Sequence, residues 1–341
     1  MLSDRHRGLS QARAKAVTEN ARAFWVLKPG RGELRSEELA APGAGEVLVR
    51  AQYSAVSRGS EALVFQGRVP PSEYQRMRCP WQAGEFPGPV KYGYSSVGKV
   101  QAGSAALLGQ WVFCLFPHQS AYVVPERAVL AIPAGVPPER AVLAANVETA
   151  LNATWDAEPR LGDRISVVGG GVLGCLCAYL LSRVPGTDVR LVDVRAERER
   201  TAQALGVGFS LPAHAERDRD LVVHASGSES GLRTALELAA SDCTVLELSW
   251  FGDTEVRLPL GAAFHQRRLS LRASQVGTVS PRARARFDHR ARLALALELC
   301  KDPLLDVLID GESTFEDLPE TMLGLASPAG GALCHRLRYE P

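Results

Sequence analysis

The chain has 341 residues, of which 46% are hydrophobic and 23% are charged, and its formal net charge is +1. This length exceeds what one hydrophobic core usually supports, so two domains are expected. The near-neutral charge gives no reason to expect a nucleic-acid partner. Every apolar stretch is interrupted well before the roughly 20 residues that a membrane helix needs, so no membrane partner is expected either.

The cysteines and the start of the chain indicate a cytoplasmic protein. Seven widely spaced cysteines are an odd number in a long chain, which is typical of reduced thiols and not of a disulfide framework. Cys175 and Cys177 lie close together, but C-x-C in a helix directs the two thiols differently, so both are expected to pack in the core. Residues 1–21 contain no secretory apolar region and are expected to form an N-terminal extension.

Between residue 22 and Pro133 the sequence is typical of β-structure, with short β-branched and aromatic runs separated by Gly and Pro. Within it, Gln66–Gly93 is dense in Pro, Gly and aromatic residues. We expect an ordered loop there that encloses a substrate. The pattern changes near Pro137, and helical spacing over Pro138–Ala153 follows.

From Asp163 onward, apolar strands alternate with amphipathic helices, which predicts a parallel sheet covered on both faces. The expected strands are Arg164–Val168, Val189–Val194, Leu221–Ala225, Thr244–Ser249 and Leu269–Ala273, with a third strand of the series unplaced. The expected helices are Val172–Arg183, Ala196–Leu205 and Glu229–Ala240. A long helix, Pro281–Cys300, and a short β-like tail follow, and the arginines between Arg282 and Arg292 are interpreted as its solvated face.

The sharpest motif is Gly169-Gly-Gly171-Val172-Leu173-Gly174, which follows an apolar strand and opens a helix. In this context G-x-G-x-x-G predicts a dinucleotide site. Gly169 permits the tight turn, Gly171 lets the backbone approach a pyrophosphate, and Gly174 allows close packing of helix and strand. The free N–H groups at the helix start, with Val172 and Leu173, would face the diphosphate.

Asp193 lies 19 residues after Gly174, at the end of the next strand, where an acidic residue is expected to bind the ribose. A carboxylate there accepts hydrogen bonds from the 2′-hydroxyl and repels a 2′-phosphate, so the sequence favours NAD. Arg195 and Arg198 could instead hold a 2′-phosphate. The alternative for the whole motif is a strand-ending acid after a chance glycine turn.

Later strand ends supply further expected cofactor contacts, because ligands of open α/β sheets sit outside the carboxyl ends of the strands. Ser226, Trp250 and Gln275 lie in the turns after three successive strands. Thr149, in the helical segment before the sheet, is also expected to contact the cofactor. Ordinary turn chemistry is the alternative for the strand-end residues.

Taken together, the order of segments resembles the medium-chain dehydrogenase/reductase superfamily. The resemblance rests on the stretches AVSRGSE (55–61), KYGYSSVGKV (91–100), FCLFPHQSAYVVP (113–125), LAANVETALNATWDA (143–157) and RRLSLRASQVG (267–277). They look most like the zinc-independent branch related to bacteriochlorophyllide hydroxyethyl dehydrogenase. The resemblance implies an α/β fold with a Rossmann doubly wound parallel-sheet domain (150–277), a β-rich GroES-like catalytic domain (22–149 plus 278–341), and a homodimer.

Zinc-dependent members of this superfamily hold the metal at three places. Here those places read Ser57-Arg-Gly-Ser60-Glu61, Gly93-Tyr94-Ser95 and Ala145-Asn146-Val147-Glu148. Catalytic zinc needs three good N, S or O ligands at fixed geometry, which Ser, Tyr and Asn do not supply. The sequence therefore predicts an enzyme without zinc or any other metal.

Without a metal, a side chain must polarise the reacting oxygen and move its proton. By the resemblance, Ser60 matches a proton-relaying hydroxyl, Tyr94 stands at a zinc-ligand position, and His118 and Glu148 lie near the substrate and the nicotinamide. Ser57 completes the candidates. The alternatives are a plain loop histidine, a core tyrosine, a solvated helix acid and a turn-forming serine.

These features predict an NAD-dependent, zinc-independent oxidoreductase that interconverts a secondary alcohol and a ketone of a small cyclic or polyol-type metabolite. An enoyl or quinone reductase using NAD(P)H is one alternative. An enzyme that retains NAD and catalyses epimerisation or elimination is another. A non-catalytic NAD-binding protein is the alternative from a different class.

Overall fold

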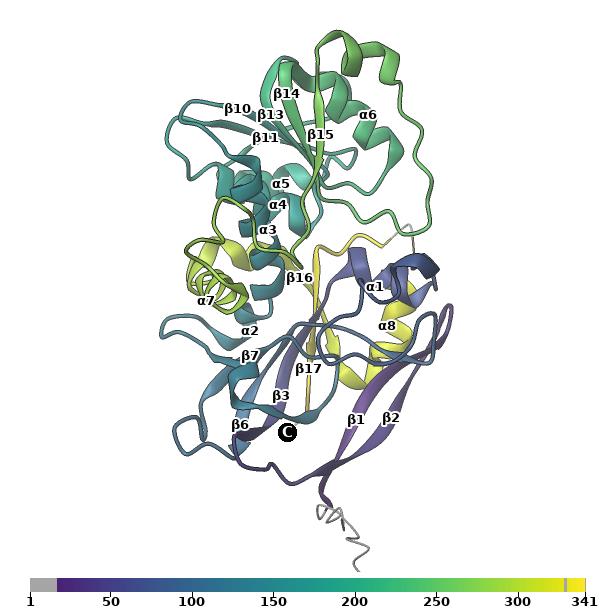
Figure 1. Cartoon of the computed structure of the whole chain (residues 1–341), viewed down its shortest axis with the longest axis vertical. Helices are drawn as coiled ribbons and strands as arrows, with labels where there is room; N and C mark the ends of the chain where they lie inside the picture. Colours follow the sequence, from purple (N-terminus) through teal and green to yellow (C-terminus); the bar gives the residue numbers. More distant parts are fainter. Residues whose placement is uncertain (1–16, 328–329, 341) are drawn as a thin grey trace, which may run out of the picture.

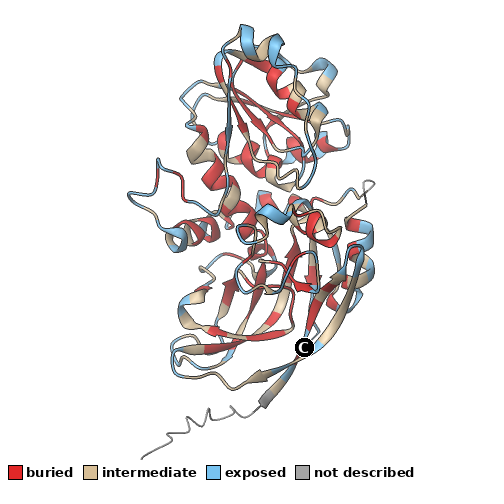
Figure 2. Cartoon of the chain, turned by 45° about the vertical axis from the view of Figure 1, so that its right-hand side comes forward, coloured by how far each residue is buried: buried red, intermediate tan, exposed pale blue. Residues whose placement is uncertain are grey.

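The computed structural model describes residues 17–327 and 330–340 (Figure 1). The chain forms two halves stacked along its long axis, one with a six-stranded sheet and the other with two further sheets, and helix α3 (Ala144–Ala157) lies between them. Most of α3 is buried. One hydrophobic cluster runs from Val97 and Phe113 through this helix into the six-stranded sheet. Figure 2 shows the buried residues following the strands of both halves.

One half contains a six-stranded parallel sheet in the order β12-β11-β10-β13-β14-β15, the 3-2-1-4-5-6 arrangement of a dinucleotide-binding fold. The central strands β10 and β13 are mostly buried, because helices cover both faces of the sheet. The strands are β10 (Arg164–Val168), β11 (Asp188–Val192), β12 (Gly208–Ser210), β13 (Arg219–His224), β14 (Ala239–Glu247) and β15 (Ser270–Ala273), and the helices are α4 (Val172–Leu181), α5 (Arg198–Ala204) and α6 (Glu229–Leu238).

The other half is β-rich, with a seven-stranded sheet and a smaller four-stranded one. The larger sheet contains β3 (Glu46–Val56), β6 (Ser96–Ala102), β7 (Trp111–Cys114), β8 (Ala121–Pro125), β9 (Val129–Ala131), β16 (Ile309–Thr314) and β17 (Cys334–Arg338). The smaller contains β1 (Val17–Lys28), β2 (Arg31–Ala40), β4 (Ala83–Gly84) and β5 (Val90–Lys91). Helices α1 (Arg58–Phe65), α2 (Pro138–Ala141), α7 (His289–Leu299) and α8 (Leu318–Leu325) complete the fold.

The predicted fold class, a Rossmann sheet domain plus a β-rich domain, is confirmed. The missing third strand is β12, a short edge strand after α5. All seven cysteines are buried and free, so the expected core packing of Cys175 and Cys177 is also confirmed. The domain limits stay a prediction, although β1 begins at Val17, inside the range assigned to an N-terminal extension. The rest of that extension, residues 1–16, lies outside the described residues.

Three helix predictions need correction. The long helix begins at His289 and not at Pro281, because Asp288 caps it by accepting a hydrogen bond from Ala291 N–H. Residues 138–153 form two helices, α2 and α3. Helix α8, with Pro319 in its first turn, was missed in a tail expected to be β-like. None of the described helices is both long and apolar enough to cross a membrane.

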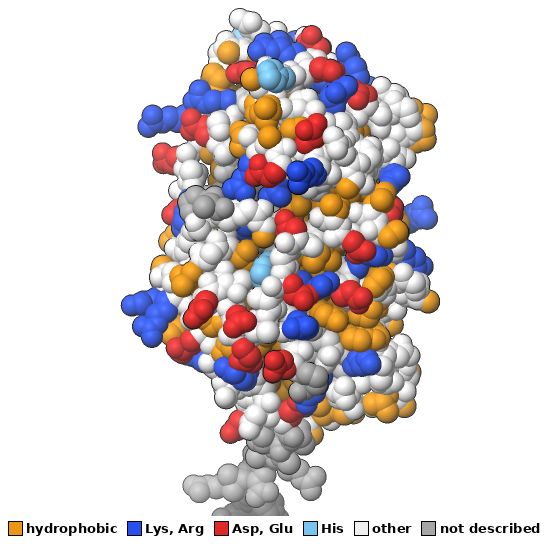
Figure 3. Space-filling view, turned by 180° about the vertical axis from the view of Figure 1, so that it is seen from behind, with side chains coloured by type: hydrophobic (Ala, Val, Ile, Leu, Met, Phe, Trp, Pro, Cys, Tyr) orange, Lys and Arg blue, Asp and Glu red, His pale blue; other side chains and the backbone are white. Residues whose placement is uncertain are grey.

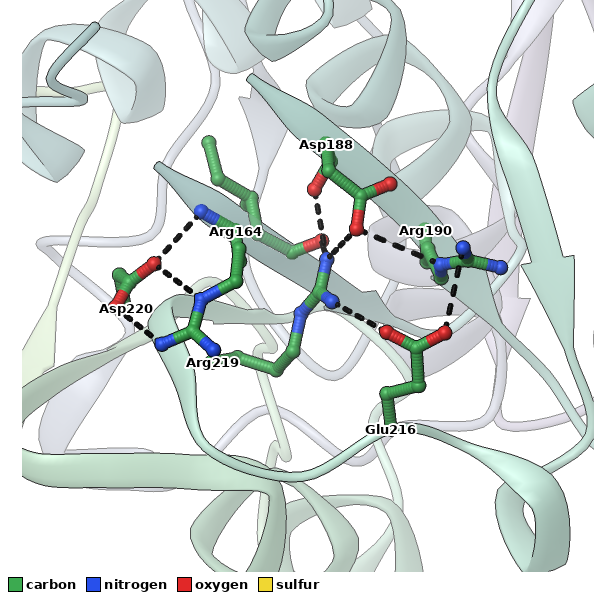
Figure 4. Close-up of polar contacts among 7 residues, drawn as sticks. Arg164, Asp188, Arg190, Glu216, Arg219 and Asp220 are labelled. Carbon is green, nitrogen blue, oxygen red and sulfur yellow. Dashed lines mark hydrogen bonds and ion pairs between the residues drawn. The ribbon is translucent and has the colours of Figure 1, made fainter. Parts of the chain in front are cut away.

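Ion pairs tie together the amino-terminal ends of the central strands (Figure 4). The Arg219 guanidinium is buried and donates to the Ile165 carbonyl at 3.1 Å and to the Asp188 carboxylate at 2.9 Å. Nearby, Arg164 pairs with Asp220 at 2.9 Å and lowers the pKa of that carboxyl to about 2. This network lies at the end of the sheet away from the carboxyl ends of the strands, so it holds the strands in place and leaves the ligand-binding end open.

Candidate active site

The glycine turn between β10 and α4 has the geometry of a diphosphate cradle. Gly169 has a φ of +111° and lies so close to the Ser226 backbone that a side chain would collide there. At Gly174 an added Cβ would overlap the Gly169 carbonyl oxygen, so helix and strand approach as closely as the motif predicts. Val172 and Leu173 are partly buried against the large hydrophobic cluster.

Gly171 differs from its neighbours because nothing in the protein explains its lack of a side chain. Its backbone (φ −74°, ψ 175°) is open to any residue, and a Cβ there would meet no protein atom within 4 Å. The space beside it adjoins the N-terminus of the ten-residue helix α4, where N–H groups without helical partners favour an anion. The turn therefore fits a dinucleotide.

Asp193 directly follows β11 and faces this turn. One carboxylate oxygen accepts a hydrogen bond from Gly170 N–H at 2.5 Å, and the other accepts one from Arg195 N–H at 2.8 Å. These bonds hold the carboxylate beside the glycine turn. The Arg195 guanidinium donates to the Gly330 carbonyl at 3.3 Å, and the buried Arg198 donates to the Gly331 carbonyl. Both arginines thus bridge to the segment before β17.

The other expected cofactor residues lie in different surroundings. Ser226 follows β13, and its hydroxyl contacts His224 Nε2 at 2.6 Å. Trp250 packs against the hydrophobic cluster of the β-rich half. Gln275 is exposed and accepts a hydrogen bond from Gly277 N–H, while the Thr149 hydroxyl donates to the Ala145 carbonyl within α3. Only Ser226 is brought against the glycine turn, and the cofactor roles of all four stay predictions.

The structure brings together three residues that the resemblance places at the zinc-ligand positions, Ser57, Tyr94 and Asn146. The Ser57 hydroxyl donates to the Asn146 side-chain oxygen at 3.4 Å, although the two residues are 89 positions apart. Tyr94 has hydrogen-bond interactions with Ser57 and with Ser60. It packs against both large hydrophobic clusters, where the two halves meet. Two hydroxyl groups and an amide therefore lie at the positions where the resemblance leads one to expect metal ligands.

The donor set does not suit zinc, because hydroxyls and an amide are poor ligands for this ion. Among residues 17–327 and 330–340, no group of three or more His, Cys, Asp or Glu side chains is arranged to hold a metal. That the reaction needs no metal stays a prediction.

Tyr94 is a weak acid in this environment. Burial raises the pKa of its hydroxyl to about 12, and the charge of Glu61 acts in the same direction. The hydrogen bonds with Ser57 and Ser60 oppose these effects but do not cancel them. Tyr94 is therefore a protonated hydrogen-bond donor throughout the physiological pH range.

His118 lies in the core and not on an open substrate wall. It is 1% exposed, its Nε2 lies 2.8 Å from a Glu61 carboxylate oxygen, and its Nδ1 lies 2.9 Å from the Ser54 hydroxyl. His118 lies in a loop, as expected, but both of its ring nitrogens have partners in a buried network, and its role stays a prediction. A direct contact with substrate stays a prediction that this burial does not favour.

Glu148 is also buried, so the alternative of a solvated helix acid is wrong. Its carboxylate accepts a hydrogen bond from Arg292 Nε at 3.0 Å, and burial raises the pKa of the carboxyl while Arg292 lowers it. Arg292 also donates to the Val276 carbonyl at 2.6 Å, which anchors the turn after β15. The interpretation of the arginines up to Arg292 as a purely solvated face is therefore wrong at this position.

Sequence reasoning missed Glu61 as a member of the site, although the motif that contains it was singled out. The available signal was a glutamate four residues, about one helical turn, after a candidate hydroxyl, and the structure shows that Glu61 is 5% exposed. Its partner His118 could not be found this way, because 57 positions separate the two.

No family model matches the chain. The D-guloside 3-dehydrogenase of Escherichia coli K12 is 22% identical over 311 residues, which cover 82% of this chain and 89% of that protein. The protein named "Probable D-xylulose reductase A" from Arthroderma otae is 27% identical over 158 residues, 42% of this chain and 44% of its own length. The match to this second relative thus spans less than half of each protein.

The solved L-idonate 5-dehydrogenase of Escherichia coli superimposes with a TM-score of 0.77 at 16% identity, covering 94% of this chain and 98% of that one. A dehydrogenase from Escherichia coli CFT073 with NADH and one from Sinorhizobium meliloti with NADP each give 0.74 at 16% identity, covering 94% of this chain and at least 99% of theirs. The chain has the fold of these solved dehydrogenases, and the relatives it matches by sequence and by structure include alcohol and polyol dehydrogenases.

Proposed function

We propose that the protein is an NAD-dependent, zinc-independent oxidoreductase that interconverts a secondary alcohol and a ketone of a cyclic or polyol-type metabolite. The observation that carries the proposal is the meeting of Ser57, Tyr94 and Asn146 where zinc-dependent relatives place their metal ligands. The cradle at Gly171 and the carboxylate of Asp193 support a dinucleotide beside it.

The residues of the site suggest how each would act. When bound, the nicotinamide supplies or accepts the hydride. The Tyr94 hydroxyl donates a hydrogen bond to the substrate carbonyl oxygen and transfers its proton as the carbonyl carbon is reduced. Ser57 and Ser60 position the tyrosine hydroxyl and stabilise the phenolate that remains, which takes a proton from solvent before the next turnover.

The substrate class follows from the uncharged hydrogen-bonding groups of the site. Serine and tyrosine hydroxyls and the Asn146 amide match the donors and acceptors of neighbouring hydroxyl groups on a sugar or cyclitol. The names of the relatives, a D-guloside, a D-xylulose and an L-idonate enzyme, agree with this class. The assignment to the bacteriochlorophyllide-related branch stays a proposal.

The deciding experiment combines cofactor binding with turnover on the metal-analysed protein. NADH fluorescence should show binding, and a panel of cyclic polyols, glycosides and their keto forms should contain a substrate without added zinc. Oxidation of NADPH in preference to NADH with enones would favour the enoyl or quinone reductase. NAD that stays bound through purification without net NADH formation would favour an epimerase or lyase. Binding of NADH without turnover of any compound would favour a non-catalytic protein.

Cofactor choice is tested at Asp193. Replacing it with serine should weaken NADH binding by about tenfold, because the 2′-hydroxyl of the ribose loses the carboxylate as its hydrogen-bond acceptor. The preference for NADH over NADPH should also decrease, because the carboxylate no longer repels a 2′-phosphate. The nearby Arg195 and Arg198 would then favour the 2′-phosphate. Fluorescence titration with both cofactors measures the ratio, and the exposed Glu199→Gln serves as a charge control. An unchanged ratio in the Asp193 variant would contradict the proposed role.

We also propose a homodimer formed through β15. All four residues of this strand are exposed, and it ends the described six-stranded sheet, so its outer edge has no partner strand there. Leu271 on this strand is 40% exposed. Pairing with β15 of a second copy would continue the sheet about a twofold axis. Sedimentation should show a dimer, and Leu271→Arg should shift it to monomer; a monomeric wild-type protein would contradict the proposal.

A further inference from the structure

A chain of buried polar groups lies beside Tyr94. Glu61 is 5% exposed and contacts His118, which is 1% exposed, and His118 contacts the fully buried Ser54. Ser54 in turn lies 3.0 Å from the Tyr339 hydroxyl on the C-terminal segment. Taking charged or titratable groups out of water is costly unless they are paired, and each of these groups has a partner within hydrogen-bond distance.

The Glu61–His118 pair contacts the backbone on both sides of the candidate site. The second carboxylate oxygen of Glu61 accepts a hydrogen bond from Ser57 N–H at 2.7 Å, which fixes the start of α1. On the other side, Gly93 packs on the His118 ring, and a Cβ there would lie 3.0 Å from the ring carbon Cδ2. Because Tyr94 is the next residue, the pair supports both Ser57 and Tyr94.

The carboxylate also brings negative charge close to the tyrosine hydroxyl. In the described part of the chain its only ion-pair partner is His118, so no arginine or lysine cancels the charge there. Burial raises the pKa values of four further groups, and the charge of Glu61 adds to this effect in each of them: Tyr92, Cys79, Tyr339 and Cys334. These four neighbours are neutral when protonated, so among the groups named around Glu61 only a protonated His118 would offset its charge.

We propose that Glu61 and His118 are positioning residues. They hold Ser57 and Tyr94 in their places at the candidate site and keep Tyr94 in its protonated, proton-donating form. This inference rests on the proposed function for its catalytic meaning. A phenolate at position 94 would lie near the carboxylate of Glu61, and that repulsion disfavours it at rest. The site is thereby arranged to donate a proton to a carbonyl oxygen, and the proton regained from solvent restores the neutral hydroxyl.

The test is a spectroscopic titration of Tyr94 in the full-length protein. Tyrosinate absorbance is followed with pH in the wild type and in Tyr94→Phe, and their difference isolates Tyr94. The same difference is then recorded in the Glu61→Gln background. Glutamine keeps an oxygen for Ser57 N–H and an amide for His118 but removes the charge. The midpoint of Tyr94 ionisation should fall by about one pH unit or more.

Two further variants separate charge from packing. Ser54→Ala removes the far contact of His118 without altering the charge, so the Tyr94 midpoint should stay at its wild-type value. Glu61→Asp keeps the negative charge, so the midpoint of Tyr94 ionisation should stay high in this variant. It is the variant to use if Glu61→Gln fails to fold. A midpoint unchanged in Glu61→Gln, or lowered in Glu61→Asp, would overturn the inference.

Kinetics and binding give an independent reading of the same variants. Glu61→Gln should leave NADH affinity within about twofold of wild type. In the same variant, the decrease of kcat/KM for reduction at high pH should begin at a lower pH than in the wild type. A merely structural role would lower Tm and leave the pH of that decrease unchanged. Because the titration needs no turnover, a protein that reduces no ketone refutes the proposed function and still allows the pair to be judged.

Discussion

Replacing Tyr94 with phenylalanine is expected to lower kcat/KM for ketone reduction by about 100- to 10,000-fold, the usual contribution of a positioned general acid. The fold should tolerate the change, since the ring keeps its packing between the two hydrophobic clusters and loses only the hydroxyl. NADH affinity should stay within about twofold, because the glycine turn is untouched. Steady-state kinetics with NADH fluorescence measures both quantities.

The pH profile of the wild type gives a second check on Tyr94. Its pKa is raised to about 12, chiefly by burial and then by the charge of Glu61. A raised pKa keeps the hydroxyl protonated to higher pH, so reduction should stay level from pH 7 to about 10 and fall only above that range. Ser57→Ala is a matched control that leaves the phenol and removes one of its hydrogen-bond partners. Full activity of Tyr94→Phe would refute the proton-donor role.

Replacing Gly171 with valine is expected to weaken dinucleotide binding at least about 100-fold, or roughly 2.7 kcal/mol. The added side chain would enter the space beside the start of α4, where the diphosphate is expected. The free energy of unfolding should change by less than about 0.5 kcal/mol, because the backbone there is extended and no protein atom lies within 4 Å of the new Cβ. Titration with NADH and thermal unfolding measure the two effects.

Gly174→Ala is the contrasting variant in the same motif. Its new Cβ would overlap the Gly169 carbonyl oxygen, so it should destabilise the fold by about 1–3 kcal/mol. The two variants thus distinguish a glycine that leaves room for a ligand, Gly171, from a glycine that allows helix and strand to pack closely, Gly174. Wild-type NADH affinity in Gly171→Val would show that the turn binds no diphosphate.

The sequence alone was sufficient for the part of the protein whose contacts are local. Strand β10, the glycine turn and helix α4 follow one another within 18 residues, from Arg164 to Leu181, and their apolar period and glycine spacing specify the structure directly. Asp193 could be placed for the same reason, because it directly follows the next parallel strand and the carboxyl ends of parallel strands meet at one edge of the sheet.

Only the tertiary structure decided which side chains come together in the candidate site. Ser57 meets Asn146 across 89 positions, His118 meets Glu61 across 57, and Arg292 meets Glu148 across 144. A regular Arg/Ala pattern carries no information about which face of a helix finds a buried carboxylate, so Arg292 was placed on the solvated face. Long-range pairing depends on how the two halves pack, and the period of a single segment does not record that packing.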